Sequence, residues 1–461
     1  MGEQIPLHTV TPDRSRFTDS GKIQTRSFTG YFRRLRIIGC SVLFLLFFGT
    51  VWLSWGGRQA VLWDLSTRQF HIFGSTFWPE DLVLLSAILI ICAFGLFFVT
   101  VLAGRVWCGY ACPQSVWTWV FLWVEKVTEG DRHQRLRLDN APMTRHKFLR
   151  RARKHALWLL ISLATGITFV GYFTPIRELA QDMATLQVGG MALFWVFFFT
   201  LATYLNAGWL REKVCLHMCP YGRFQSSMLD EDSLLITYDV ARGEPRGARK
   251  KEADYRSQGL GDCIDCQMCV QVCPTGIDIR DGLQMECIGC AACIDACDSI
   301  MDRMGYDRGL IRYTSERALK GGRPRILRPK LLGYAALLLV MIGAFGWGLV
   351  SRPLLTLDVS KDRGLYRYTA GGDVENSYVL TVRNKERSPR TYHLQVAGLE
   401  GAQLNRSVSG QVPGGKAVDI PVAISMDARD LKQPSNPVEF RLVFDHGVTV
   451  SESSQFTAAV R

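Results

Sequence analysis

Cys263-Ile-Asp-Cys266-Gln-Met-Cys269-Val-Gln-Val-Cys273-Pro274 is followed shortly by a second run, Cys287-Ile-Gly-Cys290-Ala-Ala-Cys293-Ile-Asp-Ala-Cys297. In each run, three closely spaced cysteines can ligate one iron-sulfur cube, and the fourth can reach the other cube. The spacing therefore predicts two [4Fe-4S] clusters in a bacterial-type ferredoxin domain. We expect crossed ligand sets: Cys263, Cys266, Cys269 and Cys297 for the first cluster, and Cys287, Cys290, Cys293 and Cys273 for the second. Zinc, the main alternative, fits this repeated triple spacing poorly.

Five uncharged stretches are long enough to cross about 30 Å of hydrocarbon. They are Ile37–Trp55, Leu82–Ala103, Ala156–Phe173, Met191–Ala207 and Leu331–Val350. Basic residues cluster before the first stretch and after the second, whereas the loops 56–81 and 174–190 carry little positive charge. This distribution predicts a multi-pass protein of the bacterial inner membrane, with the basic loops in the cytoplasm. It also accounts for the net charge of +12, so the lipid membrane, and not nucleic acid, is the expected partner of this charge.

The fold class that follows is a multi-domain membrane protein. We expect a cytoplasmic N-terminal segment (1–36), a four-span α-helical membrane domain (37–210), a cytoplasmic ferredoxin domain (211–330), a fifth span (331–350) and a periplasmic β domain (351–461). All fourteen cysteines precede residue 298, so the β domain must fold without disulfides. Its strands alternate in polarity between Gly- and Pro-rich turns, which predicts a small antiparallel sandwich. The predicted strands are Leu354–Val359, Tyr378–Val382, Tyr392–Val396, Ala417–Ala423, Val438–Phe444 and Val448–Ser451.

Two further cysteine motifs follow the second and fourth stretches. They read Arg105-Val-Trp-Cys108-Gly-Tyr-Ala-Cys112-Pro113 and Lys213-Val-Cys215-Leu-His-Met-Cys219-Pro220. Their similarity predicts a duplicated two-span unit. Proline favours the first turn of a helix, so we expect each cysteine pair at a helix start, where the helix dipole lowers the thiol pKa.

The second motif also contains His217 and Met218, which complete a soft donor set suited to Cu(I). Cys108, Cys112, Cys215 and Cys219 are therefore the candidate redox residues, with His217 and Met218 as additional copper ligands. The stretch Val116–Val124 is rich in tryptophan and too short to span, so we expect it at the membrane interface, as an aromatic belt or, alternatively, a quinone contact.

The two membrane motifs, the ferredoxin runs, a final span and an all-β tail together resemble the cytochrome c oxidase accessory protein family (the CcoG, FixG and RdxA proteins). The membrane half also resembles the membrane ferredoxins of periplasmic nitrate reduction and the regulators of nitrous oxide reduction. The first resemblance implies an immunoglobulin-like C-terminal domain and a cupric reductase that supplies Cu(I) to a cbb3-type oxidase. It also implies that the eight ferredoxin cysteines ligate the clusters and that the four membrane cysteines handle copper, the substrate. The implied partners are an oxidase subunit or its copper chaperones.

No nicotinamide or flavin fingerprint is present in the sequence, so electrons must come from a cytoplasmic protein or from quinol. Two other functions remain open. The protein could be a quinol-linked electron carrier that serves a periplasmic multihaem cytochrome; it has no Cys-x-x-Cys-His haem motif of its own. It could also be a non-catalytic scaffold for oxidase assembly, in which the β tail holds a subunit.

Overall fold

The computed structural model describes residues 22–458 except 363, 365 and 432, and leaves out the side chain at 223. Most of the predicted N-terminal segment, residues 1–21, lies outside the described residues. The chain divides into two compact units. The first contains the chain up to Leu53 together with Leu85–Phe345, and the second contains Ser54–Leu84 and Gly346–Arg461.

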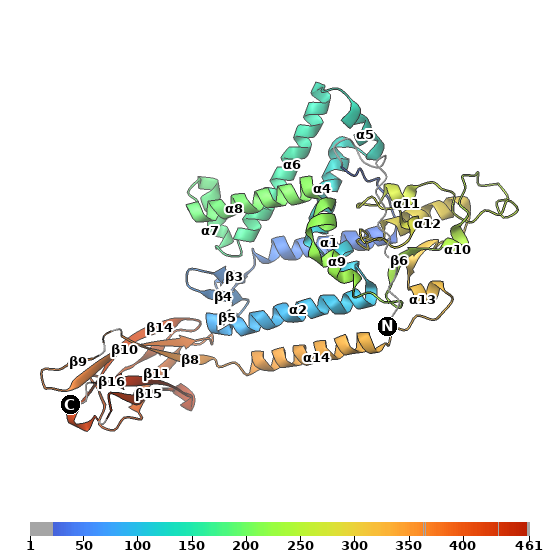
Figure 1. Ribbon diagram of the computed structural model, residues 1–461. Coiled ribbons are helices and arrows are strands. Elements are labelled where there is room, and N and C mark those ends of the chain that lie inside the picture. The colour runs from blue at the N-terminus through green and yellow to red at the C-terminus, as the bar shows by residue number, and fades with distance from the viewer. Residues whose placement is uncertain (1–21, 363, 365, 432, 459–461) are drawn as a thin grey trace. The chain divides into compact units, whose positions relative to one another are not determined.

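The helices up to the second cysteine motif form the membrane half of the first unit. Their bounds are α1 (Tyr31–Thr50), α2 (Leu82–Ala103), α3 (Val106–Tyr110), α4 (Pro113–Glu129), α5 (Arg132–Asn140), α6 (Arg145–Val170), α7 (Ile176–Thr185), α8 (Gly190–Thr203), two π-helical turns (Tyr204–Leu210 and Val214–Met218) and α9 (Pro220–Ser226). Long α6 packs against α8 and α4 (Figure 1). The buried core between them includes Phe121, Val124, Trp158 and Ala207.

Three helices among the described residues are long and apolar enough to cross a membrane: Pro79–Ala103, Gly190–Leu210 and Pro329–Val350. They contain the second, fourth and fifth predicted spans. The other two predicted spans also form helices, α1 and α6, but basic residues occupy the first turns of both. Helix α1 ends at Thr50, before the predicted end at Trp55. Five crossings and their duplication therefore stay a prediction.

The cysteine runs lie in a small ferredoxin domain within the first unit. Its elements are β6 (Leu235–Tyr238), α10 (Val240–Gly243), α11 (Met268–Gln271), α12 (Ala292–Met304), β7 (Ile311–Thr314) and α13 (Glu316–Leu319). Strands β6 and β7 pair antiparallel, and α12 packs against both α11 and β7. The buried side chains around the cysteines are mainly isoleucines, such as Ile236, Ile277 and Ile294. The domain thus surrounds its thiols with apolar side chains.

The second unit contains the predicted β sandwich and the loop after α1. One sheet has the order β12 (Gln403–Leu404), β14 (Ala417–Met426), β10 (Val374–Asn384), β8 (Leu355–Lys361), with β9 (Arg367–Tyr368) also paired to β10. The other has the order β13 (Ser409–Val412), β11 (Arg390–Ala397), β15 (Ser435–Phe444), β16 (Thr449–Thr457). Alternate residues of β10, including Tyr378, Leu380 and Val382, are buried between the sheets with Phe440 and Phe456. All six predicted strands are confirmed.

The loop 54–81 forms short strands that the sequence did not predict: β1 (Ser54–Trp55), β2 (Arg58–Gln59), β3 (Val61–Asp64), β4 (Gln69–Ile72) and β5 (Ser75–Phe77). Lys385, whose side chain is 1% exposed, pairs with Asp81 at 2.9 Å, and Arg383 pairs with Glu80 at 2.6 Å. Salt bridges therefore join this loop to the sandwich, which requires both to lie on the same side of a membrane crossed by α2 and α14 (Pro329–Val350).

Candidate redox centre

The eight ferredoxin cysteines gather in the two crossed sets. Burial raises the pKa of the Cys297 thiol, and negative charge on Cys269, Cys266 and Cys263 raises it further. In the same way, burial and charge on Cys290, Cys287 and Cys273 raise the pKa of Cys293. The last cysteine of each run therefore lies beside the first three of the other run. The assignment of these thiols as cluster ligands stays a prediction.

A cavity of about 340 Å³ lies at the second set. Its walls carry the thiols of Cys273, Cys287, Cys290 and Cys293, together with Cys269 of the first set. The remaining walls are mostly isoleucine and alanine. Several thiols around a space with dry, apolar walls provide the donor set and the low polarity that a [4Fe-4S] cube requires. The residues present fit the cofactor.

The four membrane cysteines also come together, from two separate motifs. Cys112 is the N-cap of α4 and Cys219 is the N-cap of α9, with proline at the first helical position in both cases. Negative charge on Cys112 and Cys219 raises the pKa of both Cys108 and Cys215, so these thiols lie near one another. Four thiols from the two motifs thus share one neighbourhood, which the sequence analysis did not predict.

The expected lowering of thiol pKa is wrong for two of these cysteines. Burial raises the pKa of Cys108 to about 11 and that of Cys215 to about 12. Neither residue is at a helix start: Cys108 lies within α3, and Cys215 lies within a π-helical turn. Loss of hydration, which favours the neutral thiol, therefore outweighs the dipole of the following helix.

Copper binding at this cluster stays a prediction. Within residues 22–458, apart from the gaps noted above, no three His, Cys, Asp or Glu side chains converge closely enough to hold one metal ion. Met218, which is 61% exposed, and His217 share the π-helical turn of Cys215. Two sulfur-containing side chains of the second motif, Cys219 and Met218, are thus exposed.

Two arginines connect the membrane motifs to the ferredoxin loops. Arg105, just before α3, donates hydrogen bonds to the carbonyl oxygens of Met285 and of Cys287, the latter at 3.2 Å, and also to that of Gly222 in α9. Arg36 in α1 donates to the carbonyl oxygen of Cys290 at 3.2 Å. Both cationic groups therefore hold the loop that contains the second cysteine set. Arg105 joins both membrane motifs to it.

The backbones also meet directly at this junction. A Cβ atom at Gly109 in α3 would lie 2.8 Å from the carbonyl oxygen of Gly289 and 2.9 Å from the Cα atom of Cys290. Gly289 has φ of +65°, a conformation that glycine adopts at little cost. The absence of both side chains lets the first membrane motif contact the loop of the second cysteine set.

Two acidic residues that sequence reasoning missed complete the junction. Asp295, between the last cysteines of the second run, accepts hydrogen bonds from the backbone N–H groups of Phe32 (3.1 Å) and Arg33 (2.7 Å), so it caps α1. Glu125 in α4 pairs with Lys22 (2.6 Å), Arg135 (2.8 Å) and Arg211 (3.5 Å). The available signal was an acidic residue directly after the apolar stretch Val116–Val124 of α4, because a buried carboxylate requires cationic partners.

Comparison with known proteins gives consistent matches along the chain. Residues 210–316 match the family described as "4Fe-4S dicluster domain", and residues 345–459 match the family of the IG-like fold at the C-terminal of FixG. "Nitrogen fixation protein FixG" of Rhizobium meliloti is 38% identical, over 87% of this chain and 84% of the relative. "Protein RdxA" of Cereibacter sphaeroides is 39% identical, over 86% of each chain. The crystal structure of a FixG-related protein from Vibrio parahaemolyticus is 26% identical, covers 23% of this chain and 97% of its own, and has a TM-score of 0.22.

The dicluster ferredoxin domain, the apolar helices and the C-terminal immunoglobulin-like domain define a membrane-associated iron-sulfur redox protein with 4Fe-4S clusters. Its similarity to FixG, RdxA and RdxB extends over most of the chain at 38–40% identity. The chain belongs to the FixG/RdxA family.

Proposed function

We propose that the protein reduces Cu(II) to Cu(I) at Cys108, Cys112, Cys215 and Cys219 and supplies the product for assembly of a cbb3-type cytochrome c oxidase. The observation that carries the proposal is the contact between the first membrane motif and the loop of Cys287 and Cys290. It places the backbone of the first motif against the loop that carries two predicted ligands of the second cluster.

When bound, the two [4Fe-4S] clusters supply single electrons, and one electron converts one Cu(II) to one Cu(I). Thiolate and thioether sulfur prefer Cu(I), so the four cysteines and Met218 would bind the product more tightly than the substrate. This preference favours reduction. Half-buried Cys108 and Cys215 would release their protons as copper binds, and exposed Met218 would offer the metal to an acceptor.

The proposed partners follow from the same arrangement. The electron donor is a cytoplasmic protein or quinol, and the copper acceptor is a subunit of the oxidase or one of its copper chaperones. The ferredoxin domain would face the cytoplasm, and the β domain, together with the loop 54–81, would face the periplasm. The basic residues at the starts of α1 and α6 support this orientation.

The direct test uses the full-length protein in detergent, reduced without oxygen and freed of reductant. Adding Cu(II) in the presence of a Cu(I)-specific chelator should restore the absorbance of the oxidised clusters and yield about two Cu(I) per chain, one for each cluster. Protein with oxidised clusters measures the background from thiols. If the reduced clusters persist after Cu(II) is added, or if they react only with a quinone, the copper proposal is wrong.

The junction itself can be tested by changing Gly109 to alanine. The added Cβ would collide with the backbone of Gly289 and Cys290, so the motif and the loop must move apart at a cost of about 1–3 kcal/mol. We expect reoxidation of the clusters by Cu(II) to slow about tenfold or more, because small displacements have large effects on reaction rates. Stopped-flow absorbance measures the rate.

Gly39→Ala is the matched control, because a Cβ atom there meets nothing within 4 Å. This variant should react like the parent protein. A Gly109→Ala variant that is equally fast would show that electrons do not cross at this contact.

A further inference from the structure

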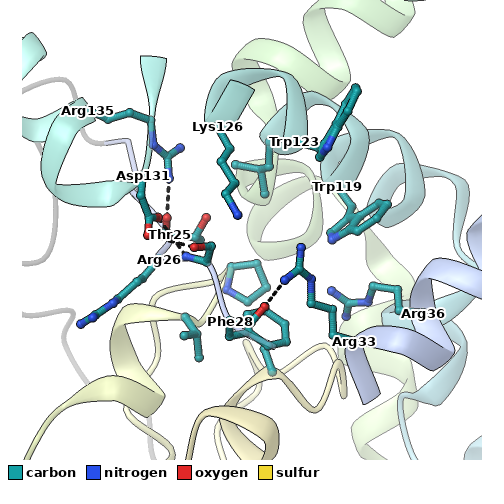
Figure 2. Close-up of a pocket in the computed structure, with 15 residues that line it drawn as sticks. Thr25, Arg26, Phe28, Arg33, Arg36, Trp119, Trp123, Lys126, Asp131 and Arg135 are labelled. Carbon is teal, nitrogen blue, oxygen red and sulfur yellow. Dashed lines mark hydrogen bonds between the residues drawn. The ribbon is translucent and has the colours of Figure 1, made fainter. Parts of the chain in front are cut away.

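A second, larger cavity lies in the first unit, where the N-terminal segment, α4 and the ferredoxin loops meet (Figure 2). Its volume is about 620 Å³ when the part that is open to solvent is included. Trp119, Leu122 and Trp123 of α4 form one wall, and Val272, Pro274 and Ala292 of the ferredoxin domain form another. The cavity therefore adjoins Cys273 without containing it.

The charged groups around this cavity are mainly positive. Arg26, Arg33, Arg36, Lys126 and Arg135 line it, and Asp131 is its one acidic residue among those described. Asp131 already accepts hydrogen bonds from the backbone N–H of Ser27 (3.0 Å), the Ser27 hydroxyl (2.9 Å) and the backbone N–H of Arg132 (2.8 Å). Arg135 pairs with Glu125 at 2.8 Å, a carboxylate that it shares with Lys22 and Arg211. The positive side chains that line the cavity therefore outnumber the carboxylates that could neutralise them.

Four of these cations have no acidic partner among residues 22–458 outside the gaps, and one of the four, Arg26, donates to the side-chain oxygen of Gln271 at 3.3 Å. Arg33 donates to the carbonyl oxygen of Phe28, Arg36 donates to that of Cys290, and no ion pair joins Lys126 to any described residue. Figure 2 shows the side chains of Lys126 and Arg33 extending into the cavity. Arg36 is only 7% exposed, and its buried Nε has no hydrogen-bond partner.

Burying a guanidinium group without a counter-charge costs several kcal/mol. A cluster held by Cys290 would compensate part of the charge on Arg36. Arg33 is half-buried and Lys126 is exposed, so water solvates part of their charge, and no carboxylate among the described residues neutralises either of them. An anion in the cavity between them would add the missing counter-charge.

We propose that this cavity binds the phosphate group of an anionic membrane phospholipid, of the phosphatidylglycerol type. Lys126 and Arg33 would hold the phosphate, and Arg36 would contribute from the cavity floor. Basic pockets beside membrane helices recognise such head groups. The tryptophans favour the same ligand, because tryptophan prefers the membrane interface and Trp123, which is 54% exposed, offers an apolar surface for the start of the acyl chains.

This lipid would join α4 to the ferredoxin residues 272–274. Lipid composition would then influence how firmly the ferredoxin domain is held against the helices. The inference goes beyond copper reduction, and its test involves no copper.

The experiment measures lipid binding by the delipidated full-length protein in detergent, by native mass spectrometry and by the shift in melting temperature. Phosphatidylglycerol should bind and stabilise the parent protein, whereas phosphatidylcholine and inorganic phosphate at equal concentration should not. Each cation contributes about 1 kcal/mol to binding an anionic lipid, so Lys126→Gln should weaken the affinity about fivefold. The double variant Arg33→Gln/Lys126→Gln should weaken it about thirtyfold.

Arg34→Gln is the matched control, because Arg34 lies beside Arg33 on α1, is exposed and does not line the cavity. It should bind lipid like the parent. Lys126 is exposed, so Lys126→Gln keeps the test decisive even if the double variant does not fold. Parent-like lipid affinity in Lys126→Gln would overturn the proposal. Equal stabilisation by inorganic phosphate would also overturn it, as would a quinone that binds the cavity in place of the lipid.

Discussion

Changing Cys215 and Cys219 together to serine is expected to remove most Cu(II) reduction and Cu(I) binding while leaving the iron and sulfide content unchanged. The two thiols belong to the motif that also contains His217 and Met218, and none of the eight ferredoxin cysteines is altered. Serine hydroxyls are hard, neutral and poor ligands for Cu(I). Loss of outer-shell partners alone often weakens metal sites 10–100-fold, so losing two direct ligands should cost about a hundredfold or more. Chelator competition measures Cu(I) affinity, and single-turnover absorbance measures reduction.

The matching change at Cys108 and Cys112 should give a similar but milder defect, because the residues between them supply no imidazole or thioether. Cys92→Ala is a suitable control, since Cys92 is a lone cysteine in α2, outside both motifs. It should bind and reduce copper normally. If both double variants also behave like the parent, the membrane motifs are structural, and a quinol-linked carrier becomes the better explanation.

The ferredoxin domain and the β sandwich could be predicted from local sequence because their signals are local. Cluster ligands must follow a narrow spacing, and the crossed sets come together as that spacing requires. Alternating polarity likewise located the long strands of the sandwich, such as β10 and β15. The two-residue strands β9 and β12 were missed, because alternation cannot be recognised over two residues. Strand β13 was also missed, because its Gly410 is typical of a turn.

The junction between the membrane helices and the ferredoxin domain could not be predicted in the same way. Its contacts join residues far apart in the chain, as when Asp295 caps α1 or Gly109 meets Gly289. No local pattern marks such pairs. The raised pKa of Cys108 and Cys215 has the same origin, because it depends on the groups that bury each thiol and not on the following proline.

Changing Glu125 to glutamine should destabilise the first unit by about 3 kcal/mol or more, because removing one member of a buried ionic group leaves its partners uncompensated. The Glu125 side chain is 1% exposed and contacts Lys22, Arg135 and Arg211. Arg211 lies two residues before the second cysteine motif and also pairs with Glu212. The variant should therefore melt at a lower temperature in detergent and hold Cys215 less firmly.

The lowered pKa of the Glu125 carboxylate predicts that the stability of the first unit depends on pH. Burial alone would raise the pKa of Glu125, but the charges of Arg211, Lys22 and Arg135 outweigh burial and lower the pKa to about 2, from an ordinary value of 4.5. Its stabilisation is therefore complete above pH 4.5 and is lost as the pH falls toward 2. The parent should lose more stability than Glu125→Gln over this range. The control, Glu178→Gln, changes an exposed acid in α7 and should follow the parent; equal acid sensitivity in the parent and Glu125→Gln would show that this ion group does not stabilise the fold.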